Sequence, residues 1–352
     1  MSQEFSASPV SPARRQFVKA AGVALTTSLF TGNVRGANDK IRVAFIGTGI
    51  MGTGNINAAM KQDSVEVVAV CDVYEPNLKQ GVAASRYFEA TPLKDFRQIL
   101  ADKSIDAVCI STPDHWHAYM TVEACKAGKD VYVEKPACTT VDEARIMVQA
   151  ARKYNRIVQL GTMQRSGTHF QQATELVRTG QLGKVTFCRG WNYSLLPQEG
   201  YGNPPDSAPP ATLDWDLWLG PAPMRPFNQN RFGVAPRRFS SFRFFWDYAG
   251  GIMTDWGIHM MDVVQMGTGD VAPKSVAALG GRYWVKDNTE TPDTLQVTWE
   301  YPDGFVAAYE YRAGNGNSMF NQNYGTIFHG TAGTLFVDRS LYGVVPEKGS
   351  TL

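Results

Sequence analysis

The sequence has no excess of charge of either sign, because 34 Lys and Arg residues face 33 Asp and Glu residues. This balance argues against a nucleic-acid-binding surface and against an acidic, solvating tail. Beyond residue 40, no apolar run is long enough to span a bilayer. Five cysteines, odd in number and without close spacing, give neither a disulfide framework nor a zinc motif. They are Cys71, Cys109, Cys125, Cys138 and Cys188.

The first 37 residues are typical of a targeting segment and not of a folded domain. The pair Arg14-Arg15 precedes Phe17, Lys19 and a short, weakly apolar stretch, which is the pattern of a twin-arginine export signal. The alternative is a short amphipathic N-terminal helix. We therefore expect the twin-arginine export machinery as a partner, and a periplasmic or otherwise exported protein whose signal is either cleaved or kept as a membrane tether.

Residues 38–164 predict a Rossmann domain. Short, nearly continuous apolar runs alternate with helical stretches, and such runs mark strands that are buried on both faces. Strands that alternate with helices imply a parallel sheet with right-handed crossovers. The expected strands are 41–46, 65–71, 107–111, 130–133 and 157–160.

Residues 165–352 predict a second domain of another class. After one more helix, at about 171–179, strand follows strand, with Asp and Gly in the turns. This pattern favours an α+β domain built on an open, mostly antiparallel sheet. The expected strands are 184–193, 274–285, 293–300, 305–312, 325–329 and 334–338.

A glycine-rich turn, Gly47-Thr48-Gly49-Ile50-Met51-Gly52, follows the first expected strand and opens a helix. In this pattern Gly47 permits the tight turn, Gly49 lets the backbone approach a pyrophosphate, and Gly52 allows close helix–strand packing. Asp72, at the end of the second strand, can accept hydrogen bonds from the adenosine ribose and would repel a 2′-phosphate. The turn therefore predicts NAD, with NADP less favoured. The alternative is a glycine turn in an unrelated α/β protein.

Three further motifs narrow the interpretation. They are the run Ser111-Thr112-Pro113-Asp114-His115-Trp116-His117, the triplet Glu134-Lys135-Pro136, and the stretch 250–262, which begins Gly-Gly and contains Asp255, Gly257 and His259. Together with the glycine turn, these motifs resemble the Gfo/Idh/MocA family over residues 41 to about 340. The resemblance implies an enzyme that oxidises or reduces sugars, polyols or related compounds with NAD(P).

By the same resemblance, the catalytic residues are Lys135, Asp255 and His259. Lys135 ends a parallel strand, where ligands of such sheets bind, and partial desolvation there suits proton transfer. Asp255 and His259 are four apart on an expected helix and therefore share one face. Histidine can take a hydroxyl proton, while Asp255 can orient the substrate or the histidine. Asp262, three residues on, is a second candidate for orienting His259.

The remaining candidates surround these residues. Lys135, Asp255 and His259 are also expected to touch the substrate, together with Arg165, Tyr193 and Trp256; for Arg165 and Tyr193 the alternative is a packing or surface role. Asp255 and His259 at helical spacing, or the pair His115 and His117, could suggest a metal site. No third ligand has a diagnostic spacing, so no metal is expected. The residues expected beside the cofactor, apart from the glycine turn and Asp72, are Ser111, Thr112, Pro113, His115, His117, Glu134, Lys135 and Gln164.

The connection 194–246 is rich in Pro, Gly and aromatic residues and is too long for a simple loop. Its aromatic side chains and interleaved arginines, Arg243 and Trp246 among them, could form a lid over a carbohydrate. The alternative is an oligomer contact or a brace between the domains. The family usually continues past the last strands with a helical segment, so a truncated C-terminus is one interpretation of the end at Leu352.

The sequence thus favours an oxidoreductase that moves hydride between a sugar or polyol carbon and the nicotinamide. Because export would separate the protein from the cytoplasmic NAD pool, we expect a tightly held cofactor. One alternative is an NAD-dependent glycoside hydrolase or lyase that oxidises its sugar transiently. Another is a non-catalytic protein that binds NAD as a structural or sensing ligand. The resemblance also implies a homo-oligomer, a dimer or a tetramer.

Overall fold

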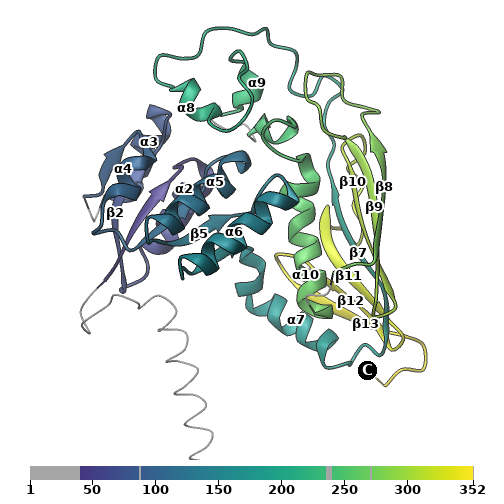
Figure 1. Cartoon of the computed structure of the whole chain (residues 1–352). Coiled ribbons are helices and arrows are strands. Elements are labelled where there is room, and N and C mark those ends of the chain that lie inside the picture. The colour runs from purple at the N-terminus through teal and green to yellow at the C-terminus, as the bar shows by residue number, and fades with distance from the viewer. Residues whose placement is uncertain (1–39, 87–88, 235–239, 270–271, 352) are drawn as a thin grey trace, which may run out of the picture.

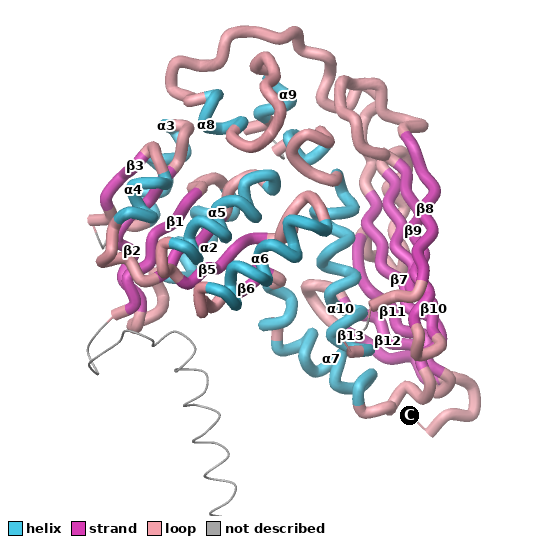
Figure 2. The backbone as a smooth tube through the Cα atoms, viewed as in Figure 1, coloured by secondary structure: helices cyan, strands magenta, loops and turns pink. Residues whose placement is uncertain are grey.

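The computed structural model describes residues 40–86, 89–234, 240–269 and 272–351. Two layers of structure face each other (Figure 1, Figure 2). One is an α/β unit built from the first half of the chain, and the other is a broad sheet with helices α7 and α10 on the side that faces the α/β unit. The expected signal segment, with Arg14 and Arg15, lies outside the described residues. In the described part of the chain, no helix has the length and apolarity that a membrane span needs.

The α/β unit is a parallel sheet covered by helices. Its elements are β1 (Ile41–Ile46), α2 (Ile50–Ala59), β2 (Val65–Cys71), α3 (Glu75–Ala84), β3 (Thr91–Leu93), α4 (Phe96–Ala101), β4 (Ala107–Ile110), α5 (His117–Lys126), β5 (Asp130–Glu134), α6 (Val141–Lys153) and β6 (Val158–Gly161). The strands lie in the order β3-β2-β1-β4-β5-β6 and pair in parallel. The expected Rossmann sheet is therefore confirmed, whereas α3, β3 and α4 were not predicted.

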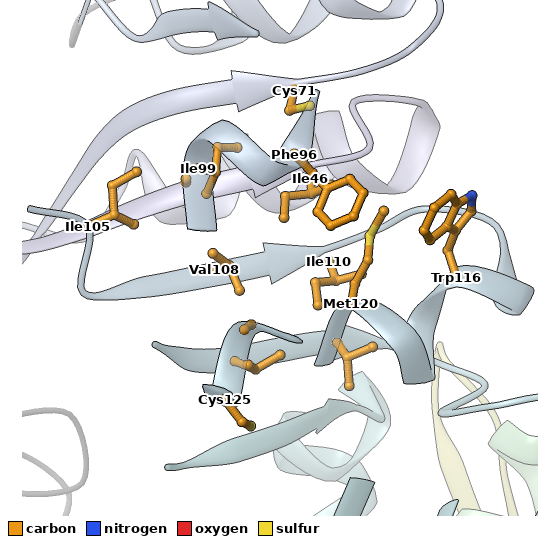
Figure 3. Packing of buried hydrophobic residues seen from close by; sticks show 14 of the residues in the cluster. Ile46, Cys71, Phe96, Ile99, Ile105, Val108, Ile110, Trp116, Met120 and Cys125 are labelled. Atoms are coloured by element: carbon orange, nitrogen blue, oxygen red, sulfur yellow. The ribbon is translucent and has the colours of Figure 1, made fainter. Parts of the chain in front are cut away.

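The core of this unit explains why the apolar runs form central strands. Ile46 on β1 and Ile110 on β4 are buried, and Phe96 of α4 and Trp116 pack edge to face with ring centroids 5.4 Å apart. Figure 3 shows these side chains converging between the sheet and its helices. Helix α6 begins at a capping box in which Thr140 and Glu143 satisfy each other's backbone N–H groups. Packing thus holds the strands in place, and the capping box fixes the start of helix α6. Ligands bind at the carboxyl ends of such strands.

The second unit is a mixed sheet. Its elements are α7 (Thr168–Arg178), β7 (Val185–Tyr193), α10 (Ile258–Thr268), β8 (Ser275–Gly281), β9 (Thr294–Tyr301), β10 (Phe305–Arg312), β11 (Tyr324–Gly330), β12 (Gly333–Val337) and β13 (Tyr342–Pro346). The strand order is β13-β12-β11-β7-β10-β9-β8. The mostly antiparallel sheet is confirmed, with one parallel pair, β7 with β10, at its centre. Strand β13 was not predicted. Val263 of α10, Phe170 of α7 and Phe328 of β11 form a common core on one face.

The described parts of the connection, 194–234 and 240–246, contribute to a compact aromatic cluster. It includes α8 (Trp215–Leu219) and α9 (Gln229–Phe232). Its buried rings pack on one another, and the stacked rings of Trp215 and Trp218 have their centroids 4.7 Å apart. The cluster packs on Val73 and Tyr74 of the Rossmann unit. The backbone N–H of Asp214 donates to the Val73 carbonyl, and the N–H of Glu75 donates to the Thr212 carbonyl. The connection therefore braces the Rossmann unit, in line with the second interpretation.

Candidate active site

A cavity of 590 Å³ lies at the carboxyl ends of the Rossmann strands, and residues of both units line it. It extends from the glycine turn to the side chains of Lys135 and His259. The predicted site residues among its walls are Gly47, Gly49, Ile50, Met51, Asp72, Ser111, Thr112, Pro113, Glu134, Lys135, Asp255, Trp256 and His259.

The glycine turn has the geometry that a pyrophosphate requires. Gly47 has φ +85°, and a Cβ added to it would lie 2.7 Å from the Ser111 carbonyl oxygen. A Cβ on Gly52 would lie 1.9 Å from the Gly47 oxygen, so Gly52 serves helix packing and does not line the cavity. Only Asn77 Nδ2, at 3.7 Å, would be near a Cβ on Gly49. Helix α2 starts directly after Gly49 and points its free N–H groups at this space. The turn therefore fits a dinucleotide.

Asp72 is held by the backbone around it. Its Oδ2 accepts from the Thr48 N–H at 2.8 Å, and its Oδ1 accepts from the Tyr74 N–H at 2.8 Å. Burial raises the pKa of this carboxyl, and these hydrogen bonds oppose the shift. Asp72 lines the cavity, whereas Thr48 is fully buried behind it and orients Asp72. Lys94, which follows β3, is a further cation in this wall.

The two histidines of the 111–117 run lie behind the cavity wall, which corrects the expectation that they touch the cofactor. His117 Nδ1 lies 2.6 Å from the Pro136 carbonyl oxygen and Nε2 lies 2.8 Å from that of Thr112. It thus joins the ends of β4 and β5 beside Lys135. His115 Nε2 lies 3.1 Å from the Trp218 carbonyl oxygen, and burial lowers its pKa to about 4. Both are positioning residues for the loops that line the cavity.

At the other end of the cavity, one buried carboxylate joins two cations. Lys135 Nζ donates to Asp255 Oδ1 at 2.6 Å, and Arg243 Nε donates to the same oxygen at 2.9 Å. Burial by itself would raise the pKa of Asp255, but Arg243 and Lys135 lower it overall. Asp255 therefore orients Lys135 and not the histidine, which corrects one of the two expected roles.

Asp255 belongs to a π-helical turn, Met253–Gly257, that precedes α10. The sequence predicted a regular helix here. Such turns replace the i→i−4 pattern locally and are frequent at functional sites. Asp255, Trp256 and His259 all line the cavity, so the widened turn still presents them to one space.

His259 is a buried, neutral imidazole. Burial lowers its pKa to about 3, and the positive charges of Lys135 and Arg339 lower it further. Its Nδ1 has no hydrogen-bond partner within the described residues. The imidazole is therefore neutral, and one of its ring nitrogens carries a lone pair.

A second carboxyl group lies in the same wall. Asp114 is buried, and burial raises its pKa to about 7, with Arg243 opposing and Asp255 adding to the shift. Asn55 donates to Glu134 Oε1 at 2.9 Å and to Ser111 Oγ at 3.1 Å, which fixes Glu134 in the wall. Sequence analysis gave no site role to Asn55 or Asp114.

Three predicted residues lie elsewhere. Tyr193 is on the sheet, its hydroxyl is bonded to Glu310, and it belongs to a separate hollow with Arg312. Arg165 pairs with Asp262 at 2.8 Å, and neither residue is among those that line the cavity. Gln164 is buried outside the cavity wall. In each case the position in the chain was close to the site, but the side chain packs between elements.

The 194–246 connection contributes to the cavity differently from the expected lid. Trp218, Phe242 and Arg243 line the cavity, and Arg243 binds Asp255. Trp246 does not line it and is 58% exposed. Of the two interpretations left open for this connection, the lid therefore gains no support from Trp246. Arg243 was found as a candidate from its aromatic context, but nothing in the sequence indicated its partner.

Comparison with known proteins places the chain in a family. Residues 41–162 match the oxidoreductase family with an NAD-binding Rossmann fold, and residues 166–338 match its C-terminal α/β domain. The chain belongs to the Gfo/Idh/MocA oxidoreductase family. Its cofactor is accordingly NAD.

Curated relatives share 28% identity. One is a glycosyl hydrolase family 109 protein of Shewanella sp. strain W3-18-1, aligned over 49% of this chain and 44% of the relative. Another is an inositol 2-dehydrogenase of Salmonella paratyphi B, aligned over 47% of this chain and 49% of the relative. The chain thus spans about half the length of the curated relatives it matches.

Among solved structures, the WlbA dehydrogenase from Bordetella pertussis with NADH and UDP-GlcNAcA has a TM-score of 0.64 at 22% identity, covering 85% of this chain and 78% of its own. A levoglucosan dehydrogenase with NADH and levoglucosan has a TM-score of 0.64 at 19% identity, covering 88% and 80%. These similarities show a shared fold.

The space around Gly49 yields a test of the cofactor site. Gly49→Ala adds a methyl group that meets no protein atom closely but lies at the cavity wall. We therefore expect roughly tenfold weaker NAD binding, while the free energy of unfolding changes by less than about 0.5 kcal/mol. Gly54→Ala, in the same helix and with nothing within 4 Å of its added Cβ, is the control. NAD titration by fluorescence and thermal unfolding measure both effects. Equal NAD affinity in the two variants would contradict this site.

Proposed function

We propose that this protein is an oxidoreductase that acts on a carbinol or hemiacetal group of a sugar or polyol. The observation that carries the proposal is the cavity that begins at the dinucleotide turn and ends at Lys135 and a neutral His259. The names of the dehydrogenase relatives and neighbours, which concern inositol, levoglucosan and UDP-GlcNAcA, support a carbohydrate substrate.

The residues divide the chemistry between them. NAD, when bound, supplies the acceptor for the hydride that leaves the substrate carbon. His259 accepts the hydroxyl proton at a ring nitrogen. Lys135, held as an ammonium by Asp255, donates a hydrogen bond to the substrate oxygen and stabilises the negative charge that develops there. Trp256 lies beside His259, with ring centroids 6.2 Å apart, and offers an apolar face to the sugar.

Removing the ammonium tests this assignment. Lys135→Met keeps the stem, and Asp255 keeps its ion pair with Arg243, so the fold should survive. We expect turnover to fall by about 10²-fold or more, because Lys135→Met removes the hydrogen bond to the developing oxyanion. A similar fall is expected for His259→Asn, which removes the proton acceptor. Turnover is measured as NADH formation with a panel of sugars and polyols. The control is Lys126→Met, at an exposed lysine that pairs with Glu123. Activity retained by both site variants would refute the assignment and favour a non-catalytic NAD-binding protein.

We also propose export through the twin-arginine pathway and, with it, an NAD molecule that remains bound through each turnover. The support is the Arg14-Arg15 pattern in the sequence, because an exported enzyme has little free NAD to exchange with. Denaturing the purified protein should release NAD in near-stoichiometric amount. Finding no nucleotide would end the recycling idea, and cell fractionation of the Arg14→Lys, Arg15→Lys variant tests export separately.

A redox-neutral glycosidase is the second candidate, because relatives of similar identity carry the glycosyl hydrolase family 109 name. The same His259 and Lys135 would then serve a transient oxidation that is reversed before product release. The two functions differ in net product. A glycoside cleaved without net NADH favours the hydrolase, whereas oxidised sugar with stoichiometric NADH favours the dehydrogenase.

We further propose a homo-oligomer that forms through the outer face of the mixed sheet. Leu279 of strand β8 and Tyr283 after it are 80% and 73% exposed, and they line one hollow together with Tyr193. Apolar groups gathered in this way mark protein contacts. Sedimentation should show a dimer or tetramer, and Leu279→Arg should dissociate it. A monomeric parent protein would contradict the proposal.

A further inference from the structure

Arg339 is a cation of the cavity wall that the chemistry above does not use. It lies in the turn between β12 and β13 and lines the same cavity as Lys135 and His259. The turn is firmly built: Asp338 Oδ1 accepts from the N–H groups of Ser340 at 2.7 Å and Leu341 at 2.9 Å. The backbone carbonyl of Asp338 is within 2.8 Å of His169 Nε2 on α7. The guanidinium is therefore presented from a fixed support.

Aromatic faces hold the guanidinium in place. Its central carbon lies 4.7 Å from the ring centre of Trp256 and 5.9 Å from that of Tyr324. Trp256 itself neighbours His259, and the charge of Arg339 helps to lower the pKa of that histidine. Arg339 thus belongs to the end of the cavity where hydride transfer is proposed and not to the glycine turn, where the pyrophosphate binds.

No described residue gives Arg339 an anionic partner. Its Nε is buried without a hydrogen bond, and burial lowers its pKa. The other two cations near this end, Lys135 and Arg243, share Asp255. A partly buried guanidinium without a carboxylate is costly, and a ligand oxyanion that binds its planar fork recovers that cost. Arginine is the side chain best suited to two parallel bonds of this kind.

We propose that Arg339 selects an acidic substrate: a sugar that carries an oxyanion, either a carboxylate or a phosphate. This inference rests on the proposed function, because it names the substrate class of the same site. The oxyanion binds the Arg339 fork, and the sugar ring lies toward Trp256, so the reacting carbinol faces His259 and Lys135. Arg339 acts as a specificity-determining residue and takes no part in the proton transfer.

The test compares acids with neutral isosteres on the NAD-loaded protein. Calorimetry would follow hexuronates of gluco, galacto and manno configuration, their uronamides, and the matching hexose 6-phosphates. We expect at least one acid to bind roughly tenfold or more tightly than its neutral counterpart. Whether the uronate or the phosphate shows this preference distinguishes the two sources of the oxyanion. A panel in which no acid binds more tightly than its neutral partner overturns the inference.

Variants assign any preference to the residue. Arg339→Gln should abolish the preference for the acid, and Arg339→Lys should retain part of it. Arg189→Gln is the control, because Arg189 also stacks on an aromatic ring, at 5.5 Å from the centre of Phe187, but lies outside the cavity. Thermal unfolding of the free variants should show Arg339→Gln as stable as the parent, since it removes an uncompensated charge. A preference that persists in Arg339→Gln overturns the inference.

Turnover is measured apart from binding, so the two proposals fail in different ways. An acid that binds through Arg339 without forming NADH or being cleaved counts against the proposed function and leaves the selectivity in place. Acids that turn over no better than their neutral counterparts in the parent protein, while both form NADH or are cleaved, leave the function in place and overturn the selectivity.

Discussion

The buried carboxylate of Asp255 is the interaction on which the active-site geometry depends. It accepts from Lys135 at the end of β5 and from Arg243 of the 194–246 connection, while its own backbone belongs to the turn before α10. Lys135, 120 residues before Asp255, and Arg243, 12 residues before it, thus meet at one carboxylate oxygen. Removing the Asp255 carboxylate would leave both buried cations without this shared partner, which is far more destabilising than losing a surface pair. The two domains are therefore held in register at the place where substrate and cofactor must meet.

The same cluster sets the protonation of the neighbouring histidine. Burial and the positive charges of Lys135 and Arg339 keep His259 neutral, whereas Asp255 acts in the opposite direction. An ammonium and a neutral imidazole in one cavity divide the work: one stabilises an oxyanion and the other accepts a proton. Ligand binding completes this arrangement, since an anion at Arg339 would offset one of the charges that hold His259 neutral.

The sequence predicted the parts of this site that depend on backbone geometry. The glycine turn could be located because each glycine answers a steric demand, seen in the contact that a Cβ on Gly47 or Gly52 would make. Side-chain partners could not be located, since they depend on how the two domains pack. Arg165 and Tyr193 were expected in the pocket from their places in the chain, but Asp262 and Glu310 bind them elsewhere. Arg339 carries no motif, and only the turn between β12 and β13 brings it to Trp256.

The 194–246 connection links the fold to the handling of the cofactor. It packs Trp215, Trp218 and Phe232 against Val73 and Tyr74, directly after Asp72, and two backbone hydrogen bonds fasten it there. Lifting it would expose several large aromatic side chains, each worth about 1.5–3 kcal/mol or more of burial. It is therefore a fixed wall of the cavity and not a lid that opens freely. The wall therefore holds Trp218, Phe232 and Arg243 in place along the cavity.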